Sequence, residues 1–207
     1  MKLTFTRHGE SEANVQEVFW NQPEGYGLTE AGRAQAHALA GTLDATRFAA
    51  LYASPVLRAR QTAEILGGRL GLTPEIADGL REWHVGVIEG RTYADETRGL
   101  HRQAMSQWLY HSNYDARIEG GESYRDMVAR FDPLIARLRD AYEGSDSNVL
   151  LVSHGGLLGS MLPRLLVNVD VDTALELGFS YATPIVAELR DGAWVCLRWG
   201  ETSCSPP

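Results

Sequence analysis

Four consecutive apolar residues, Val149 to Val152, predict a β-strand that is covered on both of its faces. Strands of this kind belong to parallel sheets, where helices pack on either side. Two further β-prone segments, at 3–6 and 48–53, alternate along the chain with segments of helical periodicity. This alternation is typical of α/β proteins. We therefore expect an α/β fold, a three-layer α/β/α sandwich with a mostly parallel central sheet.

Element boundaries are marked by capping residues, turn residues and the spacing of apolar side chains. Ser54-Pro55 supplies an N-cap and a first-turn proline, and so predicts that a helix begins there. The dipeptide Asp191-Gly192 predicts a hairpin between strands near 181–189 and 193–199. A long helix is predicted from four apolar residues at helical spacing, namely Met127, Phe131, Leu134 and Leu138.

The segment from 83 to 120 differs from the rest of the chain. It is rich in Trp, Tyr, His and Arg and has weak periodicity, apart from a helix expected around 93–112. We interpret it as a helical lid inserted over the core. Because 207 residues suffice for one domain with such a lid, we expect a single domain over 1–207 with the insertion at about 83–120.

Composition excludes several classes of function. The formal net charge of −8 argues against a nucleic-acid-binding protein, because affinity for phosphate backbones comes from an excess of basic residues. No segment approaches the roughly 18 apolar residues of a membrane span, and no apolar signal-peptide core precedes Arg7. Cys196 and Cys204 show neither metal-ligand spacing nor a disulfide framework. We expect a cytoplasmic protein without nucleic-acid or membrane partners, and the sequence leaves its oligomeric state open.

Three predicted strand ends carry residues suited to binding phosphate. The first ends in Arg7-His8, the second leads to Arg58, and the third is followed by His154. The carboxyl ends of parallel strands meet at one edge of the sheet, where ligands bind in open α/β proteins. Arginine offers a rigid fork of donors, histidine can act as a nucleophile, and the glycines after His154 open a helix whose N-terminus favours an anion. We expect a local positive pocket for phosphate in an otherwise acidic protein.

These residues lie in motifs that resemble the histidine phosphatase superfamily, the phosphoglycerate-mutase-like proteins, and specifically its larger branch. The motifs follow one another in the family's order from residue 3 to about 160. They are Arg7-His8-Gly9-Glu10-Ser11, Leu28-Thr29-Glu30-Ala31-Gly32-Arg33-Ala34-Gln35-Ala36, Ser54-Pro55-Val56-Leu57-Arg58-Ala59-Arg60-Gln61-Thr62-Ala63, Leu80-Arg81-Glu82, Gly120-Gly121-Glu122-Ser123 and Val152-Ser153-His154-Gly155-Gly156. One such motif is a weak signal, but several in the same order are specific.

The resemblance implies that His8 attacks the phosphorus and becomes a phosphohistidine. A neutral imidazole can do this when one ring nitrogen is free and the other N–H is held by a backbone carbonyl. Glu82 would protonate the leaving oxygen and then take a proton from the attacking water. The family's smaller branch typically places an aspartate as acid directly after the second histidine, where this chain has Gly155. The acid must therefore come from elsewhere in this chain, and Glu82 is the matching candidate.

The resemblance also implies the phosphate contacts. Arg7, Arg58 and His154 would gather the phosphoryl oxygens and stabilise the charge that shifts in the transition state. Asn14 would donate a further hydrogen bond, and Gly155 is expected in the same site. We therefore expect a metal-independent phosphatase for a small-molecule phosphomonoester that needs no cofactor. The loop 19–26 departs from the family's usual Gly-x-x-Asp-x-Pro-Leu-Thr pattern, so the resemblance does not extend to substrate contacts there.

Three alternatives stay open at this point. A phosphoglycerate-type mutase would return the phosphoryl group to its substrate, but such mutases usually carry an arginine pair where His111-Ser112-Asn113 precedes Tyr114-Asp115 here. A non-catalytic phospholigand-binding module would have no need of Glu82. A zinc site made of His8, His154 and Glu82 is disfavoured because the neighbouring arginines would repel the cation.

The lid carries further candidates for substrate contact. An aromatic wall of the substrate site could be formed by Trp83, Tyr93, Trp108, Tyr110 and Tyr114. A second anionic group of the substrate could bind to Arg91, Arg98, Arg102 and Arg117. On general grounds most of these side chains pack within the lid or lie on its solvated surface. The remaining histidines are interpreted as structural or lid residues, namely His37, His84, His101 and His111.

Overall fold

The computed structural model describes residues 1–205, and these form a seven-stranded sheet in the order β3-β2-β4-β1-β5-β6-β7. The first four strands in this order run parallel to one another, whereas β5, β6 and β7 are antiparallel to their neighbours. The strands are β1 (Lys2–Arg7), β2 (Ala50–Ala53), β3 (Glu75–Ile76), β4 (Asn148–Ser153), β5 (Pro184–Arg190), β6 (Ala193–Trp199) and β7 (Thr202–Ser203). The predicted parallel core and the hairpin at Asp191-Gly192 are both confirmed.

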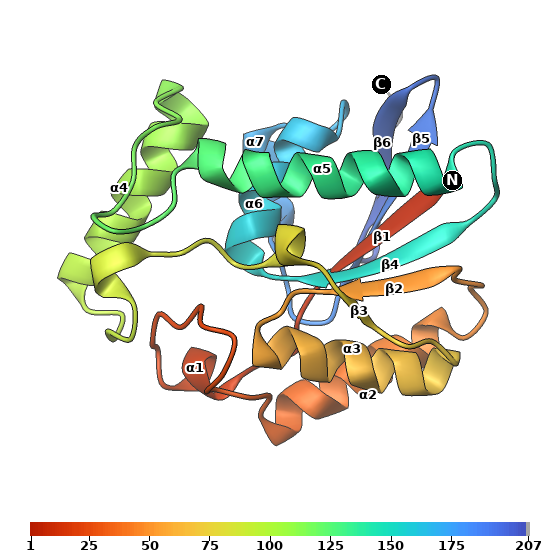
Figure 1. Ribbon diagram of the computed structural model, residues 1–207, viewed down its shortest axis with the longest axis horizontal. Coiled ribbons are helices and arrows are strands. Elements are labelled where there is room, and N and C mark those ends of the chain that lie inside the picture. The colour runs from red at the N-terminus through yellow and green to blue at the C-terminus, as the bar shows by residue number, and fades with distance from the viewer. Residues whose placement is uncertain (206–207) are drawn as a thin grey trace.

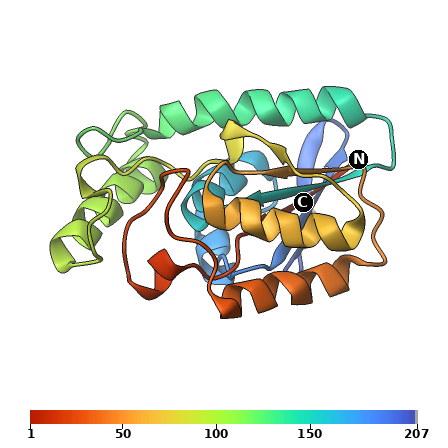
Figure 2. The ribbon, with the colours of Figure 1, turned by 60° about the horizontal axis from the view of Figure 1, so that its bottom comes forward.

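Helices cover both faces of this sheet, so the predicted three-layer arrangement is also confirmed. Figure 2 shows α5 on one side of the strands and α2 with α3 on the other. The helices are α1 (Glu12–Val15), α2 (Glu30–Leu43), α3 (Leu57–Leu70), α4 (Asp95–His111), α5 (Tyr124–Tyr142), α6 (Gly155–Leu165) and α7 (Val171–Leu177), with the short 3₁₀ turns η1 (Asp78–Leu80) and η2 (Gly86–Ile88).

The apolar run in β4 explains why both faces need a cover. Val149 and Leu151 belong to the core cluster that contains residues of α5 and α6. Leu150 and Val152 belong to a second cluster, which contains residues of α2 and α3. Since side chains alternate along a strand, four apolar residues in a row bury themselves only when both faces are packed.

The helix expected at Ser54-Pro55 begins two residues later than predicted. α3 starts at Leu57 with Val56 as its N-cap residue. The Ser54 hydroxyl instead accepts a hydrogen bond from the Val56 backbone N–H at 3.2 Å, and it lies 2.7 Å from His154 Nε2. Because Ser54 is buried at the end of β2, its hydroxyl is used within the site rather than as a helix cap.

Two glycines allow the backbone after His8 to lie directly against the first turn of α2. A Cβ atom on Gly32 would stand 1.9 Å from the Glu10 carbonyl oxygen, and one on Gly9 would stand 2.3 Å from the Gly32 carbonyl oxygen. The hydroxyl of Thr29, the N-cap residue of α2, donates to the Glu10 carboxylate at 2.7 Å. These contacts hold the segment that carries His8 at the edge of the sheet.

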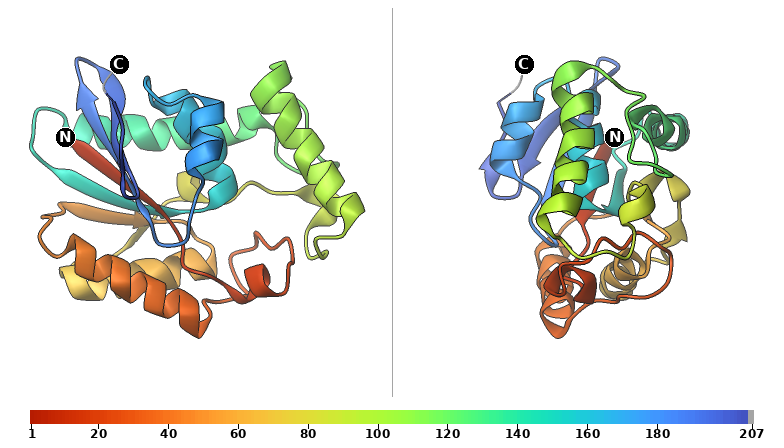
Figure 3. Two further views of the ribbon diagram at one scale, coloured as in Figure 1. Left: turned by 180° about the vertical axis from the view of Figure 1, so that it is seen from behind. Right: turned by 90° about the vertical axis from the view of Figure 1, so that its left-hand side faces the viewer.

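The segment at 83–120 lies beyond the carboxyl ends of the parallel strands, with α4 at the far end of the molecule (Figures 1 and 3). It is joined firmly to the core. The rings of Trp83 and Trp108 are 4.8 Å apart, both side chains are buried, and both belong to the cluster that contains α5 and α6. Within residues 1–205, no helix has the length and apolar character needed to cross a membrane.

Candidate active site

The three strand ends that carry the candidate residues meet at one edge of the sheet. Arg7 at the end of β1 is paired with Ser153 at the end of β4, so His8 and His154 are neighbours, with ring centroids 5.0 Å apart. Arg58, in the first turn of α3, places its Nε 2.9 Å from His8 Nε2. The parallel topology therefore brings together residues that are up to 147 positions apart in the sequence, from Arg7 to His154.

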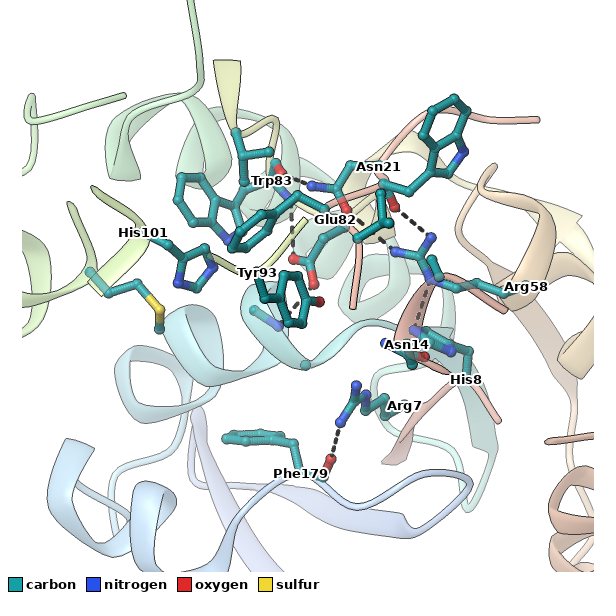
Figure 4. A pocket seen from close by; sticks show the side chains of 18 residues that line it. Arg7, His8, Asn14, Asn21, Arg58, Glu82, Trp83, Tyr93, His101 and Phe179 are labelled. Carbon is teal, nitrogen blue, oxygen red and sulfur yellow. Dashed lines mark hydrogen bonds between the residues drawn. The ribbon is translucent and has the colours of Figure 1, made fainter. Parts of the chain in front are cut away.

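A cavity of about 340 Å³ opens above these side chains (Figure 4). Most of the residues predicted for the site line it, namely Arg7, His8, Asn14, Arg58, Glu82 and Gly155. His154 is the exception. It is fully buried, in contact with the His8 ring and with Ser54.

The hydrogen bonds of His8 define its tautomer. Nδ1 lies 2.6 Å from the Gly9 carbonyl oxygen, which can only accept, so Nδ1 carries the proton. Nε2 faces the Arg58 Nε–H, which can only donate, so Nε2 holds a lone pair. Burial and the positive charges of Arg58 and Arg7 lower the pKa of His8 well below its ordinary value, against the opposing effect of the Gly9 carbonyl. The imidazole is therefore neutral, and its Nε2 lone pair accepts a hydrogen bond from the Arg58 Nε–H.

Arg58 is held by a loop for which the sequence offered no expected contacts. Its terminal nitrogens donate to the Trp20 carbonyl oxygen at 2.6 Å and to Asn21 Oδ1 at 3.3 Å. The Asn21 side chain also donates to the Trp83 carbonyl at 2.9 Å, and its backbone N–H donates to Glu89 at 2.6 Å. Burial lowers the pKa of Arg58 to about 10, so the guanidinium remains charged at neutral pH. The loop 19–26 thus positions Arg58, which is a predicted phosphate-binding residue.

Arg7 supplies the second positive charge of the cavity. It donates to the Phe179 carbonyl oxygen at 3.0 Å and stacks over the Tyr181 ring, 4.1 Å from its centroid. Its Nε is buried and has no hydrogen-bond partner within the described residues. Sequence reasoning missed Phe179 and Tyr181, because a backbone carbonyl and a stacking ring carry no motif.

Glu82 occupies the N-terminus of α6. Its carboxylate accepts hydrogen bonds from the backbone N–H groups of Gly156 at 2.9 Å and Leu157 at 2.7 Å. The sequence had suggested that this helix end would favour a phosphate, but in the structure these two donors hold the protein's own acid. A Cβ atom at Gly156 would lie 2.7 Å from a Glu82 oxygen, so a glycine is needed for the carboxylate to sit there.

The two remaining predicted residues leave polar groups available to a ligand. Asn14 Oδ1 accepts from the Ser11 backbone N–H and hydroxyl, so its amide NH₂ is the group that can donate into the cavity. His154 Nδ1 is buried without a partner among residues 1–205. Burial and the nearby positive charge of Arg58 lower the pKa of His154 well below its ordinary value.

The lid residues divide between the cavity and other surroundings. Trp83 and Tyr93 line the cavity, as does His101, which sequence reasoning had interpreted as structural. The lid arginines do not line the cavity. Three of them form ion pairs, Arg91 with Glu96, Arg98 with Glu17 and Arg117 with Asp126. The fourth, Arg102, is exposed. These arginines therefore lie outside the cavity, in keeping with the expectation that most of them pack within the lid or lie on its solvated surface.

The zinc alternative would require His8, His154 and Glu82 to gather around one ion. In the part of the chain that the structure describes, no three or more His, Cys, Asp or Glu side chains gather in a way that could hold a metal ion. The Arg58 guanidinium stands at the His8 nitrogen that a metal would need.

Comparison with known proteins agrees with this geometry. A phosphatase relative, the glucosyl-3-phosphoglycerate phosphatase of Mycobacterium tuberculosis, is 33% identical over 171 residues, which cover 80% of this chain and 75% of that protein. A 2,3-bisphosphoglycerate-dependent phosphoglycerate mutase of a Methylobacterium species is 31% identical over 195 residues, 91% of each chain. The solved structure of native mycobacterial glucosyl-3-phosphoglycerate phosphatase superposes with a TM-score of 0.80 at 28% identity and covers 97% of this chain and 99% of that one. The family model described as the histidine phosphatase superfamily (branch 1) matches residues 3–202, and the chain is an enzyme of this superfamily.

Proposed function

We propose that this enzyme is a metal-independent phosphatase that hydrolyses a small-molecule phosphomonoester through a phosphohistidine on His8. The observation that carries the proposal is the His8 tautomer. The Gly9 carbonyl holds the Nδ1 proton, and the lone pair on Nε2 lies among two guanidinium groups and a carboxylate. A neutral nitrogen beside positive charge suits attack on an anionic phosphoryl group.

In the first step, the phosphoryl group binds between Arg58 and Arg7. Arg58 Nε transfers its hydrogen bond from His8 Nε2 to a phosphoryl oxygen, and this frees the lone pair. Nε2 then attacks the phosphorus, an N–P bond forms and the P–O ester bond breaks. Glu82 gives a proton to the departing oxygen. His154 Nδ1, Arg7 Nε and the Asn14 amide are the remaining groups suited to hold the phosphoryl oxygens.

In the second step, Glu82 acts as the base. Its carboxylate takes a proton from a water molecule, the water oxygen attacks the phosphorus, and the N–P bond breaks. Inorganic phosphate leaves, His8 is again neutral, and Glu82 again carries the proton that the next cycle needs. The two arginines supply the positive charge that a metal ion supplies in other phosphatases.

A mutase remains the second candidate, because a phosphoglycerate mutase is among the relatives. A mutase must hold its phosphorylated acid while the phosphoryl group returns to a second oxygen. The lid arginines lie away from the cavity, and His111-Ser112-Asn113 stands where such mutases usually have an arginine pair. These features favour hydrolysis.

The experiment assays a panel of phosphomonoesters, including 3-phosphoglycerate, in the presence of EDTA, with inorganic phosphate and 2-phosphoglycerate both measured. We expect phosphate as the product and an acid-labile phosphoenzyme. The His8→Ala variant, which lacks only the nucleophile, should show neither. Near-normal turnover by His8→Ala would contradict the phosphohistidine, 2-phosphoglycerate as the main product would favour the mutase, and rescue of an EDTA-inactivated enzyme by zinc or magnesium would contradict metal independence.

A further inference from the structure

Beyond the groups that would handle the phosphoryl, the wall of the active-site cavity is aromatic and uncharged. The two arginines, His8 and Glu82 account for its charged or reactive lining. Much of the remaining wall is formed by Phe19, Trp83, Tyr93, His101, Met105 and Phe179.

Four of these rings, those of Phe19, Trp83, Tyr93 and His101, form a connected surface. The centroid of the Phe19 ring is 4.4 Å from that of Tyr93 and 5.1 Å from that of His101. The ring centroids of Trp83 and His101 are 4.9 Å apart. In Figure 4 the rings of Trp83 and His101 lie on one side of Glu82, and Arg58, Asn14 and His8 lie on the other. Since Glu82 protonates the leaving oxygen in the proposed reaction, the leaving group faces the rings.

The wall offers no positive charge to a substrate anion. Burial lowers the pKa of His101 to about 4, so its ring is neutral at physiological pH. Both terminal nitrogens of Arg58 are held by the 19–26 loop, and the lid arginines lie outside the cavity. A carboxylate on the leaving group would therefore lose its water against the rings without gaining a partner, which is costly.

We propose that the preferred substrate is the phosphomonoester of an uncharged alcohol that carries a planar aromatic ring, and that the cavity discriminates against phosphorylated acids. A flat ring would pack on the aromatic wall, and the flexible Met105 thioether adapts to such a partner. This inference rests on the proposed phosphatase function. It separates the enzyme from the two relatives described above, whose names refer to phosphoglycerate compounds.

The test compares kcat/KM for benzyl phosphate, 4-carboxybenzyl phosphate and 3-phosphoglycerate. The first two share a ring and an alkyl leaving oxygen and differ by one carboxylate. We expect benzyl phosphate to be favoured by at least about tenfold over both acids. If phosphate is released but either acid is hydrolysed as well as benzyl phosphate, the substrate inference is wrong and the phosphatase function stands. If no ester of the panel yields phosphate or phosphoenzyme, the proposed function itself fails.

A charge placed in the wall provides a second test. Met105→Lys adds a cation to the cavity and should raise the ratio of kcat/KM for 4-carboxybenzyl over benzyl phosphate by about tenfold. Gln103→Lys adds the same charge to an exposed position of the same helix, outside the cavity, and should leave the ratio unchanged. An equal response of the ratio to both variants would show that overall charge, and not the wall, sets the preference. Should Met105→Lys fail to fold, the wild-type comparison still decides the proposal.

Discussion

At the scale of single residues, the two nitrogens of His8 have different partners and different tasks. The Gly9 carbonyl keeps the proton on Nδ1, and Arg58 donates to Nε2. The same guanidinium that would bind the phosphoryl group thus covers the nucleophile when no substrate is bound. Arrival of an anion offers Arg58 a charged acceptor, which makes a stronger hydrogen bond than a neutral imidazole. Binding of the phosphoryl group and exposure of the nucleophile are therefore coupled.

Glu82 can be tested by its leaving group. Glu82→Gln removes the proton donor, and a general acid is typically worth about 10²–10⁴ in rate when the leaving oxygen is a poor leaving group. We expect phosphoenzyme formation from benzyl phosphate to fall by about 10² or more. Formation from p-nitrophenyl phosphate should stay within about tenfold of wild type, because nitrophenolate leaves without protonation. Pre-steady-state burst measurements on both esters give the two rates.

The p-nitrophenyl burst in the same variant is the control for an intact site. It is needed because glutamine has an NH₂ group in place of one carboxylate oxygen, so it cannot accept all the hydrogen bonds that the backbone N–H groups of Trp83, Gly156 and Leu157 donate to Glu82. Phosphoenzyme should accumulate, since its hydrolysis also uses Glu82 as base. An equal loss of burst rate with both esters would remove Glu82 from the role of proton donor.

At the scale of elements, the close approach of α2 to the segment after His8 determines where the nucleophile lies. A methyl group at Gly32 would overlap the Glu10 carbonyl oxygen at 1.9 Å, so Gly32→Ala must push the helix and this segment apart. We expect this variant to lose about 2 kcal/mol or more of unfolding free energy, within the range for overpacked sites, together with most of its activity.

Gly41 offers a matched control on the same helix. A Cβ atom there meets nothing within 4 Å, and the residue is exposed. Gly41→Ala should stabilise the protein by roughly 0.5–1 kcal/mol, because alanine has the higher helix propensity, and should leave activity unchanged. Urea unfolding and steady-state assays of both variants make the measurement. Similar stability changes in the two would mean that the backbone contact at Gly32 is unimportant.

At the scale of the whole molecule, buried neutral histidines make stability depend on pH. The folded-state pKa of His101 is about 4, below its ordinary value of 6.5. As pH falls below about 6.5, His101 binds a proton in the unfolded chain but stays unprotonated in the folded protein. The free energy of unfolding therefore decreases until about pH 4. At 1.36 kcal/mol per pKa unit, the protonation of His101 alone lowers the free energy of unfolding by about 2 kcal/mol between pH 7 and pH 5. The lowered pKa values of His8 and His154 act in the same direction.

His101→Phe keeps an aromatic ring between Phe19 and Trp83 but cannot titrate. Between pH 7 and pH 5, this variant should lose about 2 kcal/mol less unfolding free energy than wild type. Urea titrations at the two pH values provide the comparison. If both proteins lose the same stability, burial of His101 does not control its protonation.

The sequence by itself determined the layers of the fold and the set of residues at the sheet edge. A strand with four apolar residues in a row requires cover on both faces, and parallel strands must bring their carboxyl ends together. Arg7, His8, Arg58 and His154 could therefore be placed at one edge before any coordinates were known. Periodicity and motif order are local properties of a chain, and these conclusions needed nothing else.

Only the tertiary structure decided how those side chains are held and what surrounds them. Arg58 is held by the Asn21 side chain and a backbone carbonyl of the loop 19–26. The N-terminus of α6 binds the Glu82 carboxylate and not a phosphate. Arg91, Arg98 and Arg117 pair with acids outside the cavity, and His101 lines the cavity wall. Backbone donors and acceptors are the same at nearly every residue, and ring packing depends on segments far apart in the chain. No local pattern records such contacts, because they arise only when the whole chain has packed.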